Sequence, residues 1–511
     1  MTRRLRRVLL WSLAPPALAV ALFFVGVLWP LPAAEPVVTG HPVAFVGATV
    51  VDVERGVSVP GRTVLVERGR IAAVGPDGGV ALPPRTRRVD ARGRYLIPAL
   101  WDMHAHVFAV SPLLDLPLYV AYGVTGVRDL QSCPREGDPF ISCPEDKRRW
   151  TREAEEGRRV GPRIVYTTSF MANGPGMRER ISGVPRFYGT ETPEEARAFV
   201  RHFAAQGVDG IKVYDRLPRE AYFALAAEAR RLGLEVVGHR PHAVSAVEAA
   251  AAGQRSVEHA RVFLHEAYPG SAALRAAAGT ERWREERQRM VDEHDPAMAQ
   301  EIFAAFVAHG TWYVPTHLTR WRDAYADHPA VREDTLLRYL HPLMKWQLTE
   351  DLDATLTADS SAEARRGYRD FYLKGLELTG AAHRAGVKVL AGTDYVVAGA
   401  DLHRELVQLV AAGLSPAEAL RTATLNPALY LGMEREHGSI SPGKVADLVL
   451  LDADPLRDIR NTQRIRAVVF NGNLYDRRAL DGLHAAVRAR ARSGSVGCKL
   501  LWRFVRQPAS Y

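Results

Sequence analysis

Cysteine is scarce in this chain, which has only three in 511 residues. Three cysteines cannot form a disulfide scaffold, and a chain of this length buries a full core without one. The chain also has no internal repeat of fixed period. Its composition, 47% hydrophobic and 24% charged, is that of a globular protein and excludes a disordered, collagen-like or polytopic membrane chain. At roughly 100–200 residues per domain, the length predicts about three domains or one large barrel with additions.

The central part of the chain lacks an excess of basic residues. The net charge is +9, but the first 34 residues contribute +4 and residues 477–511 contribute +7. Residues 35–476 are therefore slightly acidic, at about −2. A nucleic-acid-binding protein concentrates basic charge on its folded domain, so nucleic acid is not an expected partner.

Charged residues are also missing between Val8 and Ala34, directly after an arginine-rich start. This layout is typical of a signal peptide or a signal anchor, and the segment exceeds the roughly 20 apolar residues that span a bilayer. Positive charge before the segment favours export of the rest of the chain. We therefore expect residues 1–34 to direct export and residues 8–34 to associate with a membrane. The body would face the periplasm or the extracellular side from its anchor, or be secreted after cleavage.

The basic C-terminal tail, residues 477–511, mixes arginine with leucine and aromatic residues after residue 484. Such a segment lies on an anionic membrane surface in some proteins. The alternative is an extension that docks on the body of the protein, and the sequence does not choose between them.

Cys133 and Cys143 flank a short loop that contains proline and glycine. In an oxidising compartment they could close this loop as a disulfide. The alternative, two free thiols, stays open. A zinc site is disfavoured because no histidine stands near either cysteine.

Strand-like segments at both flanks enclose a middle region in which strands alternate with helices. Residues 35–97 and the segment after about residue 433 have short apolar runs punctuated by glycine and proline, as in a small sheet or sandwich. Between residues 98 and 432, apolar runs such as RIVYTTS and VKVLAGTD alternate with alanine-rich helical stretches. This alternation indicates a parallel sheet, and its length predicts an α/β fold with a (β/α)8 TIM-type barrel.

Polar residues end several of these apolar runs, and the active site of a parallel barrel lies at the carboxyl ends of its strands. His104 and His106 stand two residues apart, so both imidazoles point to the same side of a strand. The other residues in such positions are Lys212, His239, His259 and Asp394.

Four imidazoles and a carboxylate suit zinc or a similar divalent ion. They exceed the three protein ligands of a typical catalytic zinc, which indicates two metal ions. Lys212 cannot bind a cation as an ammonium group, because it has three donors and no acceptor. It could do so only as a neutral amine or as an anionic carbamate.

This constellation resembles the amidohydrolase superfamily over residues 45–475, and within it the imidazolonepropionase-like and Xaa-Pro-dipeptidase-like branch. The motifs that carry the resemblance are ALWDMHAHV, GVTGVRDL, ATLNPALYLG and GSISPGKVADLVLLDADP. The resemblance implies a distorted barrel, residues 98–432, and a small β-sandwich built from both flanks, residues 35–97 and 433–476.

The resemblance also implies a ligand set. His104, His106 and Asp394 would hold one divalent ion and His239 with His259 the other, with zinc as the expected metal. Lys212 would be carboxylated, by reaction with carbon dioxide, and bridge the two ions. The presence of this lysine favours the two-metal, peptidase-like side of the branch over one-metal imidazolonepropionases. One departure is the segment from His239 to His242, which reads His-Arg-Pro-His instead of the common His-x-His-Gly.

The expected chemistry is hydrolysis of an amide or related carbon–nitrogen bond. A hydroxide between the metals would attack, and Asp394 would pass the proton to the leaving nitrogen. The substrate would be a small molecule, with dipeptides as candidates. Arg240 is a candidate for binding a substrate carboxylate, and Tyr214 and His317 are weaker ones.

Three alternatives stay open. The first is another hydrolase on the same metal core: a cyclic amidohydrolase, a deaminase or a lactonase/phosphotriesterase. The second is a non-catalytic scaffold relative, which the complete ligand set disfavours. The third is a membrane-tethered binding protein, which would leave the ligand set unexplained. Whether the chain forms a homo-oligomer is not readable from the sequence.

Overall fold

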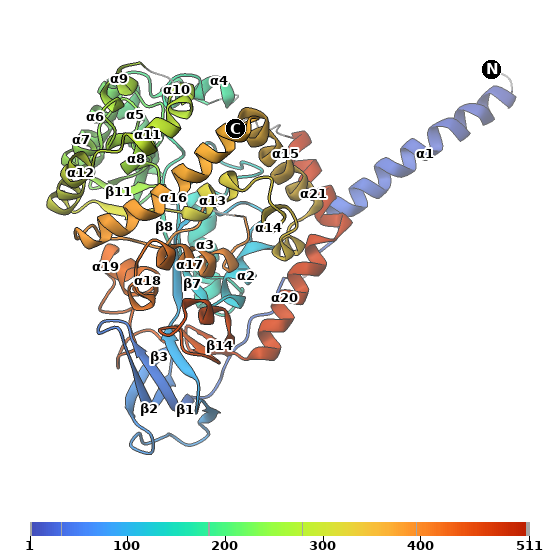
Figure 1. Ribbon diagram of the computed structural model, residues 1–511. Coiled ribbons are helices and arrows are strands. Elements are labelled where there is room, and N and C mark those ends of the chain that lie inside the picture. The colour runs from blue at the N-terminus through green and yellow to red at the C-terminus, as the bar shows by residue number, and fades with distance from the viewer. Residues whose placement is uncertain (1–2, 32, 182–183, 278–279, 395, 507–511) are drawn as a thin grey trace.

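The computed structural model describes residues 3–31, 33–181, 184–277, 280–394 and 396–506 (Figure 1). A long N-terminal helix projects from a body in which helices surround parallel strands. A larger mixed sheet forms the opposite end of the body from the green and yellow helices of the middle of the chain.

Seven parallel strands form the centre of the body. They make a three-stranded sheet of order β6-β7-β8 and a four-stranded sheet of order β12-β11-β10-β9. Their bounds are β6 (Leu100–Ala105), β7 (Val124–Asp129), β8 (Arg163–Thr167), β9 (Gly210–Val213), β10 (Glu235–Gly238), β11 (Gln254–Glu258) and β12 (Trp312–Val314). Nearly all residues of these strands are buried, which is why they read as continuous apolar runs in the sequence.

Hydrogen bonds outside the two sheets cross the gaps between them. Parallel bridges join Thr168 to Gly210 and Tyr313 to Val389. The backbone N–H of Met103 in β6 donates to the carbonyl of Ala391 at 2.9 Å. In the described parts of the chain, the parallel strands nevertheless form two separate sheets and no closed barrel. The predicted eight-stranded barrel is therefore found only in part, because the strands are short and their ladders are interrupted by register shifts that apolar runs do not reveal.

Helices cover the parallel strands, and local sequence explains their limits. The helix α5 begins at Pro193 after Thr192, whose side chain accepts a hydrogen bond from the N–H of Glu195. The main helices of this region are α2 (Asp115–Ala121), α3 (Pro144–Glu155), α5 (Pro193–Ala205), α6 (Arg219–Arg231), α7 (Ala246–Ala251), α8 (Val262–Glu266), α12 (Pro296–His309), α13 (His317–Ala324), α15 (Pro342–Ala358), α16 (Ala362–Arg384), α17 (Ala400–Ala411), α18 (Pro416–Thr422) and α19 (Leu425–Tyr430). Short helices fill the connections: α4 (Met177–Arg180), α9 (Ser271–Ala276), α10 (Thr280–Glu285), α11 (Arg287–Asp292) and α14 (Pro329–Arg332).

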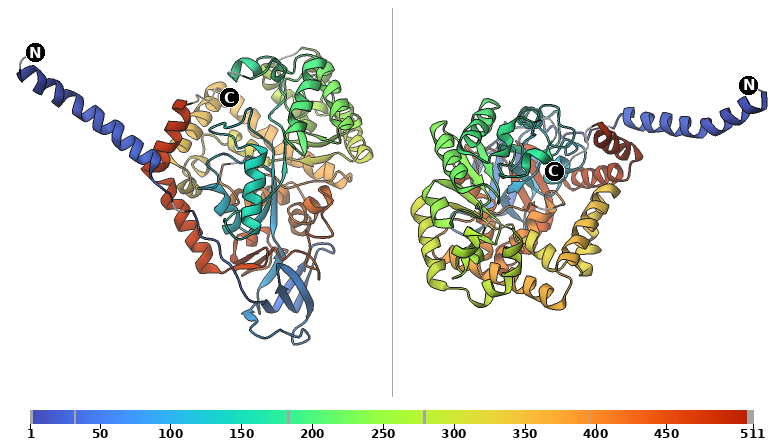
Figure 2. Two further views of the ribbon diagram at one scale, coloured as in Figure 1. Left: turned by 180° about the vertical axis from the view of Figure 1, so that it is seen from behind. Right: turned by 90° about the horizontal axis from the view of Figure 1, so that it is seen from above.

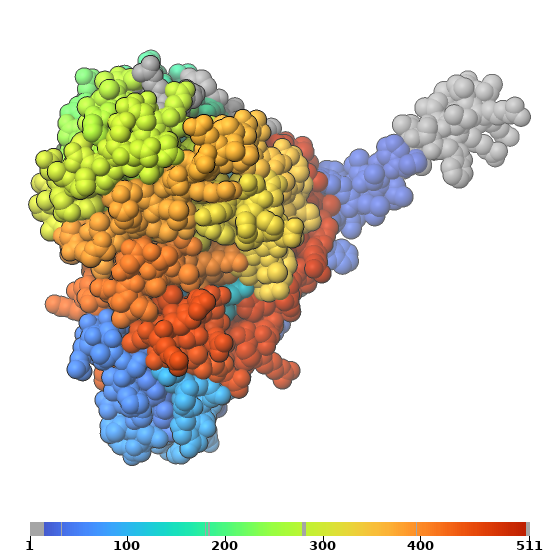
Figure 3. Space-filling view, in the orientation of Figure 1, coloured from blue at the N-terminus to red at the C-terminus, as the bar shows by residue number. Residues whose placement is uncertain are grey.

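The large sheet combines strands from both flanks of the chain. Its order is β15-β14-β13-β5-β1-β2-β3, and β4 pairs with β1. The bounds are β1 (Val43–Asp52), β2 (Val57–Glu67), β3 (Arg70–Pro76), β4 (Arg87–Asp90), β5 (Tyr95–Pro98), β13 (Leu448–Leu451), β14 (Ile465–Phe470) and β15 (Asn473–Tyr475). The two flanks meet where β5 pairs antiparallel with β13, with Leu96 opposite Leu450. The blue and red surfaces adjoin at this end of the molecule in Figure 3.

The predicted β-sandwich is not confirmed, because these strands hydrogen-bond in one continuous sheet. Their apolar side chains still share one core, which contains Phe45 of β1, Val64 of β2 and Leu450 of β13. An alternating sequence pattern shows which face of a strand is buried, but not which strand lies beside it.

The predicted membrane anchor is wrong. Within the described residues, no helix is long and apolar enough to cross a membrane. The N-terminal helix α1 (Arg3–Leu28) contains Pro15 and Pro16 and ends before the uncharged run does. A count of uncharged residues overstated the apolar length, because the run also holds prolines, a serine and a glycine. The membrane-anchored localisation predicted from residues 8–34 is therefore wrong as well.

The C-terminal tail packs on the rest of the chain as two helices, α20 (Arg477–Ala491) and α21 (Gly494–Arg506). Leu480 and Val487 of α20 are buried, and α20 lies against α2. The end of α1 lies against α21, while the remainder of α1 projects from the body (Figure 2). There Ser495 donates a hydrogen bond to the carbonyl of Gly26 at 2.6 Å. Residues 507–511 of the tail lie outside the described residues.

Cys133 and Cys143 are joined in a disulfide. The loop that they close is attached to the segment after β6. The N–H of Ala109 donates to the carbonyl of Phe140 at 2.7 Å, and the Ser142 hydroxyl donates to the carbonyl of Val107.

Candidate metal centre

Six side chains from five segments meet at one edge of the parallel strands. His104 lies in β6 and His106 directly after it, Lys212 lies in β9, and the others follow β10, β11 and the segment 387–393. His104, His106, Lys212, His239 and Asp394 line a cavity of about 100 Å³ together with Tyr214, Leu130, Gln131 and Met171. His259 adjoins this cavity through its contact with His239. The structure thus brings all six predicted ligands together.

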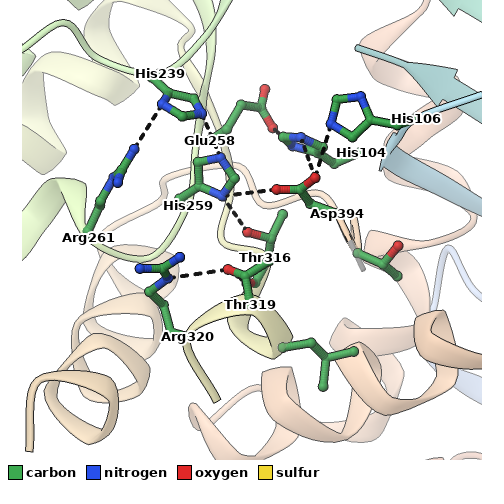
Figure 4. Close-up of polar contacts among 12 residues, drawn as sticks. His104, His106, His239, Glu258, His259, Arg261, Thr316, Thr319, Arg320 and Asp394 are labelled. Carbon is green, nitrogen blue, oxygen red and sulfur yellow. Dashed lines mark hydrogen bonds and ion pairs between the residues drawn. The ribbon is translucent and has the colours of Figure 1, made fainter. Parts of the chain in front are cut away.

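The side chains of the four histidines and Asp394 converge (Figure 4). His239 Nε2 and His259 Nε2 lie 2.8 Å apart. His106 Nε2 and His104 Nε2 lie 3.0 and 3.6 Å from the same oxygen of Asp394. Ligand atoms of His104, His259 and Asp394 all lie within 4.8 Å of one another, a spacing that fits one ion. His104 Nε2 is buried and has no hydrogen-bond partner in the described part of the chain, which a metal ion would supply.

Glu258 binds the ring nitrogen of His104 that faces away from the proposed metal site. The Nδ1–H of His104 donates to Glu258 Oε2 at 2.9 Å, and Arg128 donates to Glu258 Oε1 at 2.7 Å. All three side chains are fully buried. Burial by itself would raise the pKa of Glu258, but Arg128 and His104 hold it at about 2. A charged Glu258 fixes the His104 tautomer that leaves Nε2 free for a metal.

The other two buried imidazoles are fixed in the same way. His239 Nδ1 lies 2.9 Å from Asp215 Oδ1, and Arg261 pairs with both oxygens of that carboxylate. His259 Nδ1 lies 2.8 Å from the hydroxyl of Thr316. Burial lowers the pKa of His239 to about 4, so its ring is neutral near pH 7. A neutral imidazole with one nitrogen occupied and the other facing the cavity is the form that binds a metal ion.

Three residues of the site have a left-handed backbone. The φ angles are 75° at His259, 45° at Thr316 and 46° at Asp394. Non-glycine residues in this region cost free energy and cluster at functional sites, where the surrounding structure enforces them. Here the strained backbone turns each side chain sharply at the end of its strand.

Lys212 is the one predicted cation in the site. It is 3% exposed, and burial lowers its pKa. No hydrogen bond or ion pair to its Nζ is found among the described residues. An unpaired ammonium group buried in this way is costly, which favours a neutral amine or a modified side chain.

The three candidate substrate contacts lie at different depths. The Tyr214 ring stacks on His239 with centroids 3.8 Å apart and lines the cavity. Arg240 lies away from it, with its guanidinium donating to the carbonyl of Val244 at 2.6 Å and 3.2 Å from Glu266. His317, the first residue of α13, is fully buried and does not line the cavity.

Glu258, Asp215 and Thr316 are site residues that the sequence pattern did not reveal. Glu258 directly precedes His259, and alternation along a strand places neighbours on opposite faces. The left-handed backbone at His259 breaks that alternation, so both side chains reach the site. The available signal was the polar pair Ser256 and Glu258, two residues apart in a buried strand, where they share a face and hydrogen-bond at 2.6 Å.

Comparison with known proteins agrees with this geometry. The model of the amidohydrolase family matches residues 95–475. An imidazolonepropionase from Symbiobacterium thermophilum is 25% identical over 411 residues, which cover 77% of this chain and 84% of that protein. Adenine deaminase 3 from Rhizobium meliloti is 25% identical over 422 residues, 78% of this chain and 53% of that protein, so the chain spans about half its length. Among solved structures, a bottromycin amidohydrolase has a TM-score of 0.65 at 26% identity and covers 88% of this chain and 90% of its own.

A Xaa-Pro dipeptidase structure has a TM-score of 0.59 at 19% identity, covers 85% of this chain and all of its own, and bears on the fold alone. The chain belongs to the amidohydrolase family. This confirms the predicted family and the predicted class of enzyme, a metal-dependent hydrolase of carbon–nitrogen bonds, and a deaminase fits the same evidence.

Proposed function

We propose that the site holds two divalent metal ions, with zinc as the expected metal. His104, His106 and Asp394 would bind one ion, and His239 with His259 the other. The group of His104, His259 and Asp394, whose ligand atoms lie within 4.8 Å of one another, would then span the two ions. The donor set supports this, because His104, His239 and His259 each have their other ring nitrogen already occupied. Neutral imidazole and carboxylate are ligands that zinc prefers.

Lys212 would complete the site as a carbamate. It is the residue on which the proposal of a two-metal site mainly rests. A neutral lysine amine can add carbon dioxide and release a proton, which gives an anionic carbamate with two oxygen ligands. The burial of Lys212 among metal-binding side chains, without a partner among the described residues, supports this conversion. An unmodified ammonium group there would repel both ions.

The proposed reaction is hydrolysis of an amide bond in a small molecule, with dipeptides as the first candidates. A bound divalent ion polarises a carbonyl group and lowers the pKa of water. Asp394 would accept the proton of the attacking water and donate it to the leaving nitrogen. Its carboxylate lies 3.0 Å from His106 at the edge of the cavity, where a substrate nitrogen would sit. Of the three candidate substrate contacts, Tyr214 is the best placed, because it lines the cavity.

We also propose that the parallel segments form a distorted (β/α)8 barrel over residues 98–432. The bridge from Thr168 to Gly210 supports it, because it joins the two parallel sheets on one side. On the other side the segment 387–393 lies between the sheets, bridged to β12 through Tyr313 and Val389 and hydrogen-bonded to β6 through Ala391 and Met103. Outside this barrel, we propose that the chain divides into an N-terminal segment of residues 1–34, a composite domain of residues 35–97 and 433–476, and a C-terminal tail of residues 477–511.

Replacement of Lys212 tests the metal site directly. Lys212→Ala should lose bound metal and activity, and a short carboxylic acid such as propionate should restore part of both by supplying the missing oxygens. Lys345→Ala, remote from the site, is the control and should keep both. A Lys212→Ala protein with full metal content and full rate would contradict the proposal.

Deamination is the second candidate, favoured by the similarity to adenine deaminases. Purified, metal-loaded protein should be screened against dipeptides, N-acyl amino acids, imidazolones and aminopurines. Release of an amino acid would identify a peptidase-like enzyme. Release of ammonia from an aminopurine, with no hydrolysis of dipeptides, would favour the deaminase.

A further inference from the structure

A second cavity, of about 430 Å³, lies outside the metal site in the large sheet. It is bounded by β4, by β13, β14 and β15, and by the start of α20. Six arginines line it: Arg87, Arg88, Arg94, Arg466, Arg477 and Arg478. Asp90 and Asp476 are the acidic residues of the lining, so its net charge is strongly positive. No role in the proposed hydrolysis uses this cavity.

Both flanks of the chain contribute to this cavity. The strand β4 is a branch of the sheet that pairs only with β1, so its other edge is open towards the cavity. The strands β14 and β15 form an antiparallel hairpin, and α20 begins directly after it. The arginines are far apart in sequence, and the fold gathers them in one place.

Ion pairs neutralise only part of the lining. Arg87 lies 2.9 Å from Asp476, and Arg94 lies 3.0 Å from Asp452. The exposed side chains of Arg88, Arg466 and Arg478 have no hydrogen-bond or ion-pair partner within the described residues. Three unpaired guanidinium groups around one cavity repel one another, and a bound anion would remove that repulsion.

The chemistry of the lining selects phosphate groups. Guanidinium groups bind phosphate oxygens with two parallel hydrogen bonds. The volume is that of a small-molecule site and not of a groove for a polymer.

We propose that this cavity binds a small molecule carrying two or more phosphate groups. The site is separate from the metal centre and belongs to the sheet that joins the two flanks. The competing explanation is that arginines on an open strand edge only prevent pairing with another chain. That explanation predicts no saturable binding.

Isothermal titration calorimetry of the full, metal-loaded chain with tripolyphosphate tests the proposal. One site per chain is expected, with an affinity that falls as sodium chloride is raised. Orthophosphate should bind at least about tenfold more weakly, because it engages fewer guanidinium groups. The absence of saturable binding would overturn the proposal.

The double variant Arg88→Glu/Arg466→Glu locates the site. The side chains of both residues are exposed and have no hydrogen-bond or ion-pair partner among the described residues, so the fold should survive. Binding of tripolyphosphate should weaken about tenfold or more. The control Arg366→Glu/Arg435→Glu makes the same change of net charge at exposed positions elsewhere and should bind as the parent does. Unchanged binding by the first variant would place the phosphate on the metal ions and overturn the proposal. Tighter binding of a single-stranded oligonucleotide than of tripolyphosphate at this site would overturn it as well.

Discussion

The Nε2 atoms of His239 and His259 lie 2.8 Å apart, and neither imidazole faces water. Asp215 occupies the other nitrogen of His239, and Thr316 that of His259. Burial lowers the pKa of His239 to about 4 and that of His259 below its usual value, so both rings are neutral near pH 7. When Asp215 and Thr316 accept the two Nδ1 protons, the Nε2 lone pairs face each other. This arrangement is stable only with a cation or a shared proton between them.

Metal removal should therefore destabilise the protein. At a free metal concentration 100 times Kd, binding stabilises a folded chain by about 2.7 kcal/mol. Calorimetry with and without a chelator should show a lower Tm without metal. His239→Ala should bind less metal and respond less to the chelator, whereas an equal chelator effect in both proteins would contradict a metal at this pair.

Asp394→Asn separates binding from catalysis. Asparagine keeps one carbonyl oxygen but cannot take up a proton near neutral pH. Loss of general acid–base help typically reduces rates by about 10²–10⁴. We expect kcat to fall by at least this factor while the variant keeps most of its metal, measured by elemental analysis. A near-normal kcat in a metal-replete variant would show that another group moves the proton.

Glu258→Gln should weaken metal binding through His104. Glutamine cannot keep both the Nδ1–H of His104 and Arg128 bound as a carboxylate does, and loss of such an outer partner typically costs about 10–100-fold in metal affinity. Competition with a chromogenic chelator measures this change. Glu266→Gln is the control, because Glu266 is also buried and paired with arginines but does not touch a metal ligand. Equal metal affinities of the two variants would contradict the role of Glu258.

Glu405 should make stability depend on pH. Burial raises its pKa to about 8, although the N–H groups of His317 and Leu318 donate to it. The folded state then holds a proton that the unfolded state releases above its ordinary pKa of 4.5. This contribution is fully present below pH 4.5 and is lost as the pH rises towards 8, by up to about 1.4 kcal/mol per unit. Unfolding of the parent and of Glu405→Gln, compared between pH 5 and 8, should show a steeper slope in the parent. Asp401, whose pKa burial raises to about 7, contributes a slope of the same sign to both proteins.

The six proposed metal ligands were readable from the sequence because each ends an apolar run. In parallel strands the ends of such runs meet at one edge, so position along the chain translates into proximity in space. Glu258 and Thr316 were not readable in this way. Their places depend on left-handed backbone at His259 and at Thr316 itself, and no local pattern signals it.

The sequence predicted the strands but not all of their pairing. Apolar patterning located strands in both flanks, but the pairing of β5 with β13 depends on segments far apart in the chain. The prediction of a membrane anchor was wrong because it relied on the absence of charged residues. A membrane-spanning helix must also be continuously apolar. Arg240 was a candidate on residue type alone, and its engagement by Glu266 and backbone carbonyls became visible only in the fold.

The pairing of β5 with β13 also affects how the chain is made. Arg94 and Asp452, which form an ion pair beside this junction, are 358 residues apart. During synthesis β1 to β5 leave the ribosome long before their partner exists, and the edge of β5 stays open meanwhile. Open strand edges are templates for pairing with other chains. Recovery of native protein should therefore depend on how well nascent chains are kept apart until residue 451 has emerged, and release of a chain truncated before β13 should yield aggregates.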